Sequence, residues 1–182
     1  MTPIEQHLYK KAEFLVSPHF DERVDPADIS LLVIHNISLP PNQFGGGYIQ
    51  DLFLGNLDWG KHWYFKQIEG LRVSSHLLIQ RDGQVIQFVP FDKRAWHAGV
   101  SSFERREACN DFSIGIELEG ADDIPFTDIQ YQQLIEVTQA LLKAYPKINK
   151  NRIAGHSDIA PGRKTDPGKH FDWQRYRSAL GV

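Results

Sequence analysis

Residues 112–119, FSIGIELE, alternate strictly between two kinds of side chain, and this pattern constrains the fold more than any other in the sequence. Even-numbered positions from 114 to 118 carry isoleucine or leucine, whereas odd-numbered positions from 115 to 119 carry glycine or glutamate. Successive side chains of a β-strand point to opposite faces, so the pattern predicts a strand with one apolar and one polar face. Glu117 lies on the polar face.

Three further segments have the character of strands. Residues 29–35, ISLLVIH, form a short apolar run that is typical of a buried strand, and residues 152–155 form another short one. The segment SHLLIQ-RDGQ-VIQFVP places Asp82 and Gly83 between two alternating runs. This arrangement predicts a β-hairpin.

Two helices are expected between and after these strands. Residues 127–145 carry an apolar stripe at helical spacing, their first residue can cap the helix, and Pro146 ends it. A final helix begins at Asp172. Because strands and helices are interspersed, we expect an α/β fold with a mixed β-sheet. Segments 36–59 and 92–111 are expected to be long irregular loops, which are often functional in compact domains.

The length and charge of the chain limit its class. Its 182 residues suit a single domain. With 20 basic and 23 acidic residues the net charge is −3, and no basic block stands out, so a nucleic-acid partner has no electrostatic support. No window reaches the roughly 18 apolar residues of a membrane span, so no membrane partner is expected.

The N-terminal region and the cysteine content suggest a compartment. Charged residues interrupt the N-terminal segment where a secretory signal would need an apolar run. The one cysteine, Cys109, cannot form an intrachain disulfide, which fits a reducing environment. We therefore expect a cytoplasmic protein, whose oligomeric state the sequence leaves open.

Two of the eight histidines end apolar strands. His35 closes the run 29–35, and His156 follows the short strand near residue 153. Asp166 comes ten residues after His156, in a turn-rich segment that can bend back. Two imidazoles and a carboxylate suit a catalytic zinc ion, which takes three protein ligands and keeps a fourth position for water. From spacing alone, the alternative is that both histidines make ordinary hydrogen bonds at strand ends.

The chain resembles the N-acetylmuramoyl-L-alanine amidases of the peptidoglycan-recognition type in five segments, which in order are VIHNIS, VSSHLLIQRDG, AWHAGVS, NDFSIGIELEG and AGHSDIAPGRKTDPG. The similarity runs from about residue 30 to residue 176 of a single domain spanning residues 1–182. It implies a central mixed β-sheet flanked by helices, with long irregular loops around a zinc site. It also implies one Zn²⁺ per chain, held by His35, His156 and Asp166.

The resemblance assigns catalytic roles to Glu117, as the acidic residue, and to Lys164, which lies two positions before Asp166. It implies that zinc makes a water acidic and that Glu117 takes a proton from this water and later returns one to the leaving amine. Lys164 would help to stabilise the oxyanion. Without the resemblance, Glu117 fits a solvated strand face and Lys164 an ordinary surface position.

The peptide stem of such a substrate bears carboxylates, so its site should offer cations. Arg72, Arg105 and Arg106 are the candidates, with a plain surface position as the alternative for Arg72. Close members of the family carry an arginine directly before the Cys-Asn-Asp run. This chain has Ala108 there, a departure that leaves the exact carboxylate contact open.

Four other residues are assigned to the surroundings of the site. Asn36, beside His35, and the neighbouring pair Trp96 and His97 are candidates to face the sugar or peptide, although Trp96 fits a loop core equally well. His76 starts the hairpin and is expected to make a buried hydrogen bond or to support a metal ligand from behind.

The resemblance therefore implies a zinc amidohydrolase that cleaves the amide between the lactyl group of (1,6-anhydro-)N-acetylmuramic acid and L-alanine of muropeptides, in cytosolic peptidoglycan recycling. One alternative is a module that binds wall fragments without cutting them; filled ligand positions favour the enzyme. The other is a lytic amidase acting on intact wall, which the missing signal peptide disfavours. In such relatives, clearance of anhydro-muropeptides also keeps a β-lactamase regulator unactivated.

Overall fold

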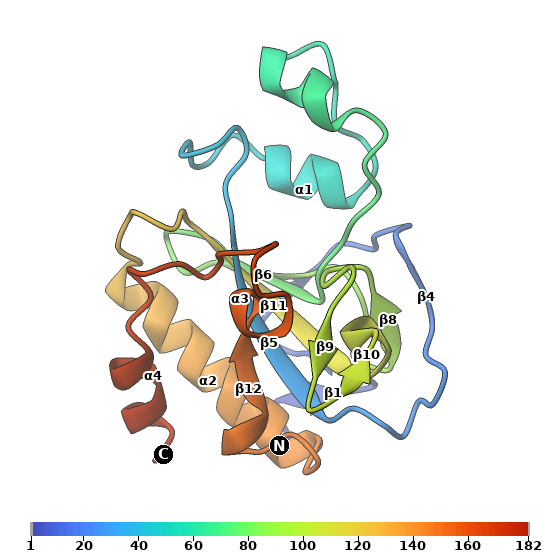
Figure 1. The fold of residues 1–182 in the computed structure, drawn as a ribbon, viewed down its shortest axis with the longest axis vertical. Coiled ribbons are helices and arrows are strands. Elements are labelled where there is room, and N and C mark those ends of the chain that lie inside the picture. Colours follow the sequence, from blue (N-terminus) through green and yellow to red (C-terminus); the bar gives the residue numbers. More distant parts are fainter. Residues whose placement is uncertain (1, 182) are drawn as a thin grey trace.

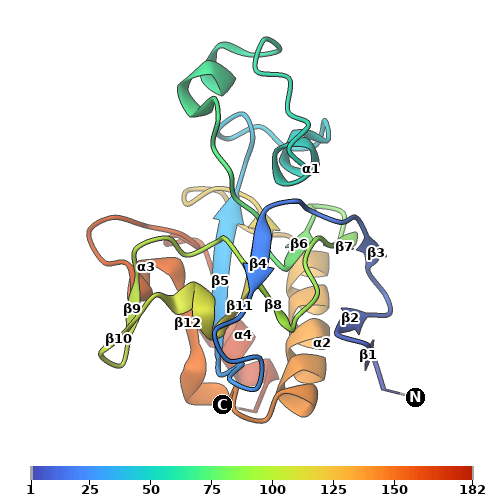
Figure 2. The ribbon, with the colours of Figure 1, turned by 90° about the vertical axis from the view of Figure 1, so that its right-hand side faces the viewer.

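The computed structural model describes residues 2–181 and is organised around a six-stranded β-sheet (Figures 1 and 2). In spatial order its strands are β12 (Ile153–Gly155), β5 (Leu31–Ile37), β11 (Ser113–Glu119), β6 (Leu77–Ile79), β7 (Val85–Gln87) and β3 (Glu13–Phe14). β5 pairs in parallel with β11 and β12, whereas β6 and β7 form the antiparallel hairpin that the sequence predicts. The sheet is thus mixed, which confirms the predicted α/β class.

One face of the sheet is covered by α2 (Asp128–Ala144) and α4 (Trp173–Ala179), which lie side by side (Figures 1 and 2). The even-numbered residues of β11 point to this side, and Ile114 and Ile116 belong to the same core cluster as Leu134 and Val137 of α2 and Tyr176 of α4. The apolar half of the alternating pattern therefore anchors the helical layer, as expected from its period.

Helix α2 begins and ends where the sequence predicts. The Thr127 side chain accepts a hydrogen bond from the backbone N–H of Gln130, and the Gln130 side chain accepts one from the backbone N–H of Thr127. This reciprocal capping satisfies donors that the first helical turn leaves free. The helix ends before Pro146, which cannot continue it.

The opposite face of β11 is enclosed as well, so the solvated polar face considered for this strand is wrong. All seven residues of β11 are buried. The cover on this side of β11 comes from the His97 ring, which packs on Gly115, and from the 3₁₀ helix η2 (Cys109–Asp111), while α3 (His156–Ile159) lies beside the neighbouring strands β5 and β12. Central parallel strands are commonly buried on both faces. The glutamates of β11 consequently lie inside the protein.

The segment after β5 is more structured than the predicted loop 36–59. The strand continues to Ile37, and the segment contains α1 (Tyr48–Phe53) before the 3₁₀ helix η1 (Trp63–Ile68). Figure 1 shows this part at the top of the view, beyond the end of β5. Leu52 and Phe53 are buried in a second cluster with Phe65 and Phe88. Four-residue spacing of apolar side chains over 48–53 is the helical signal there.

The predicted loop 92–111 also contains short elements. They are β8 (Lys93–Ala95), the hairpin of β9 (Ser102–Phe103) and β10 (Arg106–Glu107), and η2. The remaining elements are β1 (Ile4–Glu5), β2 (Leu8–Tyr9), β4 (Phe20–Glu22), which pairs with β8, and the 3₁₀ helix η3 (Lys150–Arg152). Within residues 2–181, no helix combines the length and the apolar character needed to cross a bilayer.

Candidate metal centre

The three residues expected as metal ligands lie together at one end of the sheet. His35 is on β5, His156 begins α3 directly after the neighbouring strand β12, and Asp166 follows on the next loop. The Nδ1 atoms of His35 and His156 are 2.9 Å apart, and each lies 3.0 to 3.1 Å from Asp166 Oδ2. The backbone N–H of Ser157 donates to the Asp166 carbonyl, which ties this loop to α3.

The protonation of His156 can be read from its other ring nitrogen. Nε2 lies 3.0 Å from the Ala98 carbonyl, which can only accept, so Nε2 carries the proton. In the neutral ring, Nδ1 then carries no proton, and its lone pair faces the Asp166 carboxylate. Two acceptor atoms 3.0 Å apart repel each other, so this contact needs either a proton on Nδ1 or a metal ion between the two atoms.

The electrostatic surroundings favour the ligand forms of the other two residues. Burial lowers the pKa of His35 to about 4, so its imidazole is neutral at pH 7. Burial alone would raise the pKa of Asp166, but hydrogen bonds and positive charge from the His156 and His35 rings, where these are protonated, lower it well below the usual value, and a metal cation in the place of those protons favours the carboxylate in the same way. Two neutral imidazoles and one carboxylate form a donor set that fits a zinc ion.

Glu117 lies beside this cluster, opposite His35 in the parallel pairing of β11 with β5. Its Oε1 is 3.9 Å from His35 Nδ1. Its Oε2 is buried and has no hydrogen-bond partner within residues 2–181. Burial raises the pKa of Glu117 well above its usual value, the charge of Asp166 raises it further, and Lys164 partly opposes the shift. A raised pKa makes this carboxyl group a stronger proton acceptor than an exposed glutamate, which is a property required of a general base.

These groups line a cavity of about 250 Å³. Its lining includes the ionisable side chains of Glu117, His156, Asp166 and the exposed Lys164, together with apolar residues of α1, η1 and the segment before α1, among them Leu39 and Phe53. The cavity therefore combines ionic and apolar surface, which is the usual character of a small-molecule site.

Four of the residues expected near the substrate line this cavity or its rim, and His97 is one of them. Asn36 lines it, and its amide donates to Asp122 Oδ1 at 2.7 Å. Trp96 lines it as well and stacks on His19, with ring centroids 6.0 Å apart. Arg72 is exposed on an adjoining pocket that also includes Lys164.

His97 and His76 lie behind the candidate ligands. His97 is buried, with its Nδ1 2.9 Å from His35 Nε2, and the small part of its surface that remains open lines the cavity. His76 accepts a hydrogen bond from the Gly115 backbone N–H, which confirms the buried hydrogen bond expected for this residue. The rings of His76 and His97 are 5.8 Å apart, so His76 is one layer further from the metal site.

Arg105 and Arg106 are not brought to the site. They lie at the β9–β10 hairpin, and neither lines the cavity that holds Glu117. Arg106 forms an ion pair with Asp28 and stacks over the ring of Phe112. The sequence placed both residues near the substrate because they precede the Cys-Asn-Asp run, but the hairpin turns them away.

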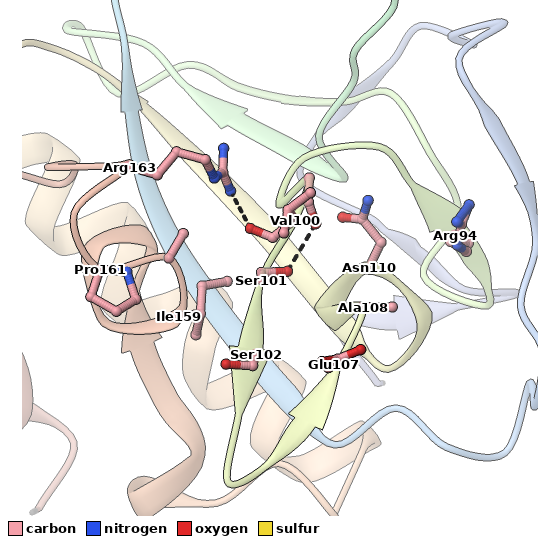
Figure 3. A pocket seen from close by; sticks show the side chains of 12 residues that line it. Arg94, Val100, Ser101, Ser102, Glu107, Ala108, Asn110, Ile159, Pro161 and Arg163 are labelled. Carbon is pink, nitrogen blue, oxygen red and sulfur yellow. Dashed lines mark hydrogen bonds between the residues drawn. The ribbon is translucent and has the colours of Figure 1, made fainter.

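A second cavity, of about 790 Å³, lies between the β9–β10 hairpin and α3 (Figure 3). Arg163, which the sequence analysis missed although it adjoins Lys164, reaches from one side and donates to the Val100 carbonyl. A pocket of about 310 Å³ adjoins both cavities, since it shares Gly99, Asn110 and Arg163 with this one and His156 and Lys164 with the metal site.

Known proteins share this sequence and fold. Residues 25–169 match the family model described as N-acetylmuramoyl-L-alanine amidase. The chain is 59% identical over 177 residues to the 1,6-anhydro-N-acetylmuramyl-L-alanine amidase AmpD of Haemophilus influenzae, an alignment that covers 97% of this chain and 96% of that protein.

Solved structures of amidases match the fold of this chain. A crystal structure of a selenomethionine derivative of AmpD matches with a TM-score of 0.94 and 57% identity, over 97% of this chain and 98% of that one. The amidase AmiD from Escherichia coli, solved in complex with the substrate anhydro-N-acetylmuramic acid-L-Ala-D-gamma-Glu-L-Lys, matches with a TM-score of 0.62 and 31% identity, over 84% of this chain and 58% of that one.

Proposed function

Because the chain belongs to the N-acetylmuramoyl-L-alanine amidase family, we propose that it hydrolyses the amide between the lactyl group of 1,6-anhydro-N-acetylmuramic acid and L-alanine in muropeptides. The observation that carries this proposal is the placement of a buried, proton-accepting Glu117 beside the crowded donor atoms of His35, His156 and Asp166. This combination suits hydrolysis of an unactivated amide.

The metal in this proposal is one zinc ion, held by His35, His156 and Asp166. The lone pair of His156 facing the Asp166 carboxylate supports a cation at this position. Zinc there supplies Lewis acidity, which polarises a carbonyl group and makes water acidic near neutral pH.

Glu117 and Lys164 are proposed to carry the proton transfer and the charge stabilisation. Glu117 accepts a proton from the attacking water as the new C–O bond forms at the lactyl carbonyl. It then gives the proton to the L-alanine nitrogen as the C–N bond breaks, so the products are a free carboxylic acid and a free amine, and transfer of the acid proton leaves them as carboxylate and ammonium at neutral pH. The ammonium group of Lys164 lines the same cavity and donates to the oxygen that gains negative charge.

The substrate would contact both the ionic and the apolar surface of the site. The apolar surface formed by α1 and η1 suits the faces of a sugar ring. The peptide stem would extend into the adjoining pocket, where Arg72 and Arg163 offer cations for its carboxylates. AmiD was solved with an anhydro-muramyl tripeptide as substrate, which supports a ligand of the same class here.

A 1,6-anhydro substrate is a fragment that has already left the wall, so the proposed role is peptidoglycan recycling. We place it in the cytoplasm, carried by one amidase domain with its core at about residues 30–176. Cell fractionation tests the compartment.

The assay that tests the substrate claim offers two substrates in parallel, a soluble anhydro-muropeptide and insoluble sacculi. We expect release of the peptide from the soluble substrate at a much higher rate than from sacculi. A preference for sacculi would instead indicate a lytic amidase, and tight binding of the soluble fragment without any cleavage would indicate a binding module.

A further inference from the structure

The two candidate zinc histidines turn their outer nitrogens toward the same short stretch of chain, His97–Ala98. His35 Nε2 lies 2.9 Å from His97 Nδ1, and His156 Nε2–H donates to the Ala98 carbonyl at 3.0 Å. Neither His97 nor Ala98 is among the three expected ligands. The stretch therefore contacts both imidazoles from behind.

This stretch is held in place by side chains from other elements. Asn110 Oδ1 accepts from the backbone N–H of His97 at 3.2 Å and from that of Ala98 at 2.8 Å. Arg163 donates to the Ala98 carbonyl and to the Val100 carbonyl, each at 2.6 Å, and Figure 3 shows it reaching toward Val100. Asn110 thus holds the backbone N–H groups of the stretch, and Arg163 holds its Ala98 carbonyl.

The His97 ring is also fixed from below. Its Nε2 is 3.0 Å from Ser113 Oγ, and the ring packs directly on Gly115 of β11. A Cβ atom at position 115 would lie 2.5 Å from the ring, which no real Cβ contact allows. Glycine at this position of the alternating strand is therefore what makes room for His97.

From these contacts we propose that His97 and the Ala98 carbonyl are positioning groups that hold both zinc histidines with Nε2 protonated and Nδ1 free. The Ala98 carbonyl can only accept, which sets the proton of His156 on Nε2. With its proton on Nε2, His35 donates to His97 Nδ1. The proton of His97 then lies on its own Nε2, which donates to Ser113 Oγ. Asn110 keeps the stretch in register with the site.

This proposal rests on the proposed zinc site, and it gives His97 a role beside the substrate contact expected from the sequence. Partners of this kind orient ligating histidines, and their loss typically weakens metal binding by about 10- to 100-fold. The experiment asks whether zinc affinity depends on the acceptor atom of residue 97 or only on the volume of its side chain.

A matched pair of variants answers that question, because glutamine and methionine have nearly the same size and only glutamine keeps a strong acceptor. We expect His97→Met to bind zinc about 10- to 100-fold more weakly in competition with a chromophoric chelator, and His97→Gln to recover most of the loss. Gly115→Ala, which displaces the ring without changing its chemistry, should resemble His97→Met. The exposed His170→Met is the control.

The second readout is the proton position in the zinc-loaded wild type. Long-range ¹H–¹⁵N spectra should show Nε2–H on both His35 and His156, and His97→Met should change the His35 signals. A zinc-binding wild type whose affinity and spectra are unaltered by both His97→Met and Gly115→Ala would overturn the positioning role alone. A wild type that binds no zinc would overturn the proposed metal site, and the positioning role with it.

Discussion

Glu117 and His35 lie directly opposite each other on the parallel strands β11 and β5, with Glu117 Oε1 3.9 Å from His35 Nδ1. A shift of the strand register by one residue would turn Glu117 to the helical face of the sheet. The parallel pairing thus sets which acidic residue can serve as the base. Burial at this position also raises its pKa, so location and proton affinity have one structural cause.

Replacement of Glu117 should separate chemistry from metal binding. We expect Glu117→Gln to lower kcat by about 10²- to 10⁴-fold, because the general base is lost while the ligand set stays intact. Metal analysis should find zinc retained. Glu136→Gln on the exposed surface of α2 is the matched control. Near-wild-type turnover of Glu117→Gln would exclude this residue as the base.

Replacement of Lys164 should reduce the stabilisation of the oxyanion. We expect Lys164→Met to lower kcat by about 10²- to 10³-fold with zinc content unchanged. Lys150→Met, on the exposed helix η3, should have no effect on turnover. Steady-state kinetics on a soluble anhydro-muropeptide make the measurement, and a loss confined to KM would argue that Lys164 only binds substrate.

The arginines should differ in their effect on substrate affinity. Arg72→Ala should raise KM by about tenfold, since it removes a charged hydrogen bond to the peptide stem. Arg106→Ala should leave KM unchanged, because Arg106 is paired with Asp28 away from the cavity. Equal effects of the two variants would contradict the proposed path of the peptide.

The stability of the metal-free protein should fall as the pH drops below about 6.5. Burial lowers the pKa of His35 to about 4 and the pKa values of His76 and His97 well below 6.5. At these three rings the unfolded chain therefore binds more protons than the folded one below pH 6.5, whereas the raised pKa of Glu117 acts in the opposite direction at one group. Each histidine then costs up to about 1.4 kcal/mol per pH unit until its folded pKa is reached.

Urea unfolding at pH 7, 6 and 5 measures this dependence. His76→Gln removes one buried titrating ring that does not touch the zinc ligands, and it should make the dependence shallower. Equal free energies of unfolding at pH 7 and pH 5 would contradict the buried, neutral state of these rings.

The elements with local signals were predictable from the sequence, and the layers around them were not. The capping residue Thr127 and the stop at Pro146 specify α2 within the helix itself, and Asp82-Gly83 specifies the hairpin of β6 and β7. The alternation in β11 predicted its apolar face. It could not show that the other face is covered, because that cover comes from His97 and η2, whose packing is not encoded in β11.

For the site as well, residues within recognisable sequence segments were predictable, and contacts between distant segments were not. The resemblance brought forward His35, His156, Asp166, Glu117 and Lys164, and the structure brings these five side chains to one place. It did not reveal the use of His97, Asn110 or Arg163, since their contacts depend on how separate loops pack behind the ligands. Gly115 is the one sign of this packing in the local sequence, because a glycine inside a strand often marks a place where another group approaches the backbone closely.

The most direct test of the account is mass spectrometry of the products formed from a 1,6-anhydro-N-acetylmuramyl peptide, with and without a chelator. We expect two products, the anhydro-sugar with a free lactyl carboxylate and the peptide with a free L-alanine amine. Chelation should abolish both, and added zinc should restore them in the wild type and not in His35→Ala. Cleavage at another bond, or undiminished cleavage by zinc-free protein, would contradict the account.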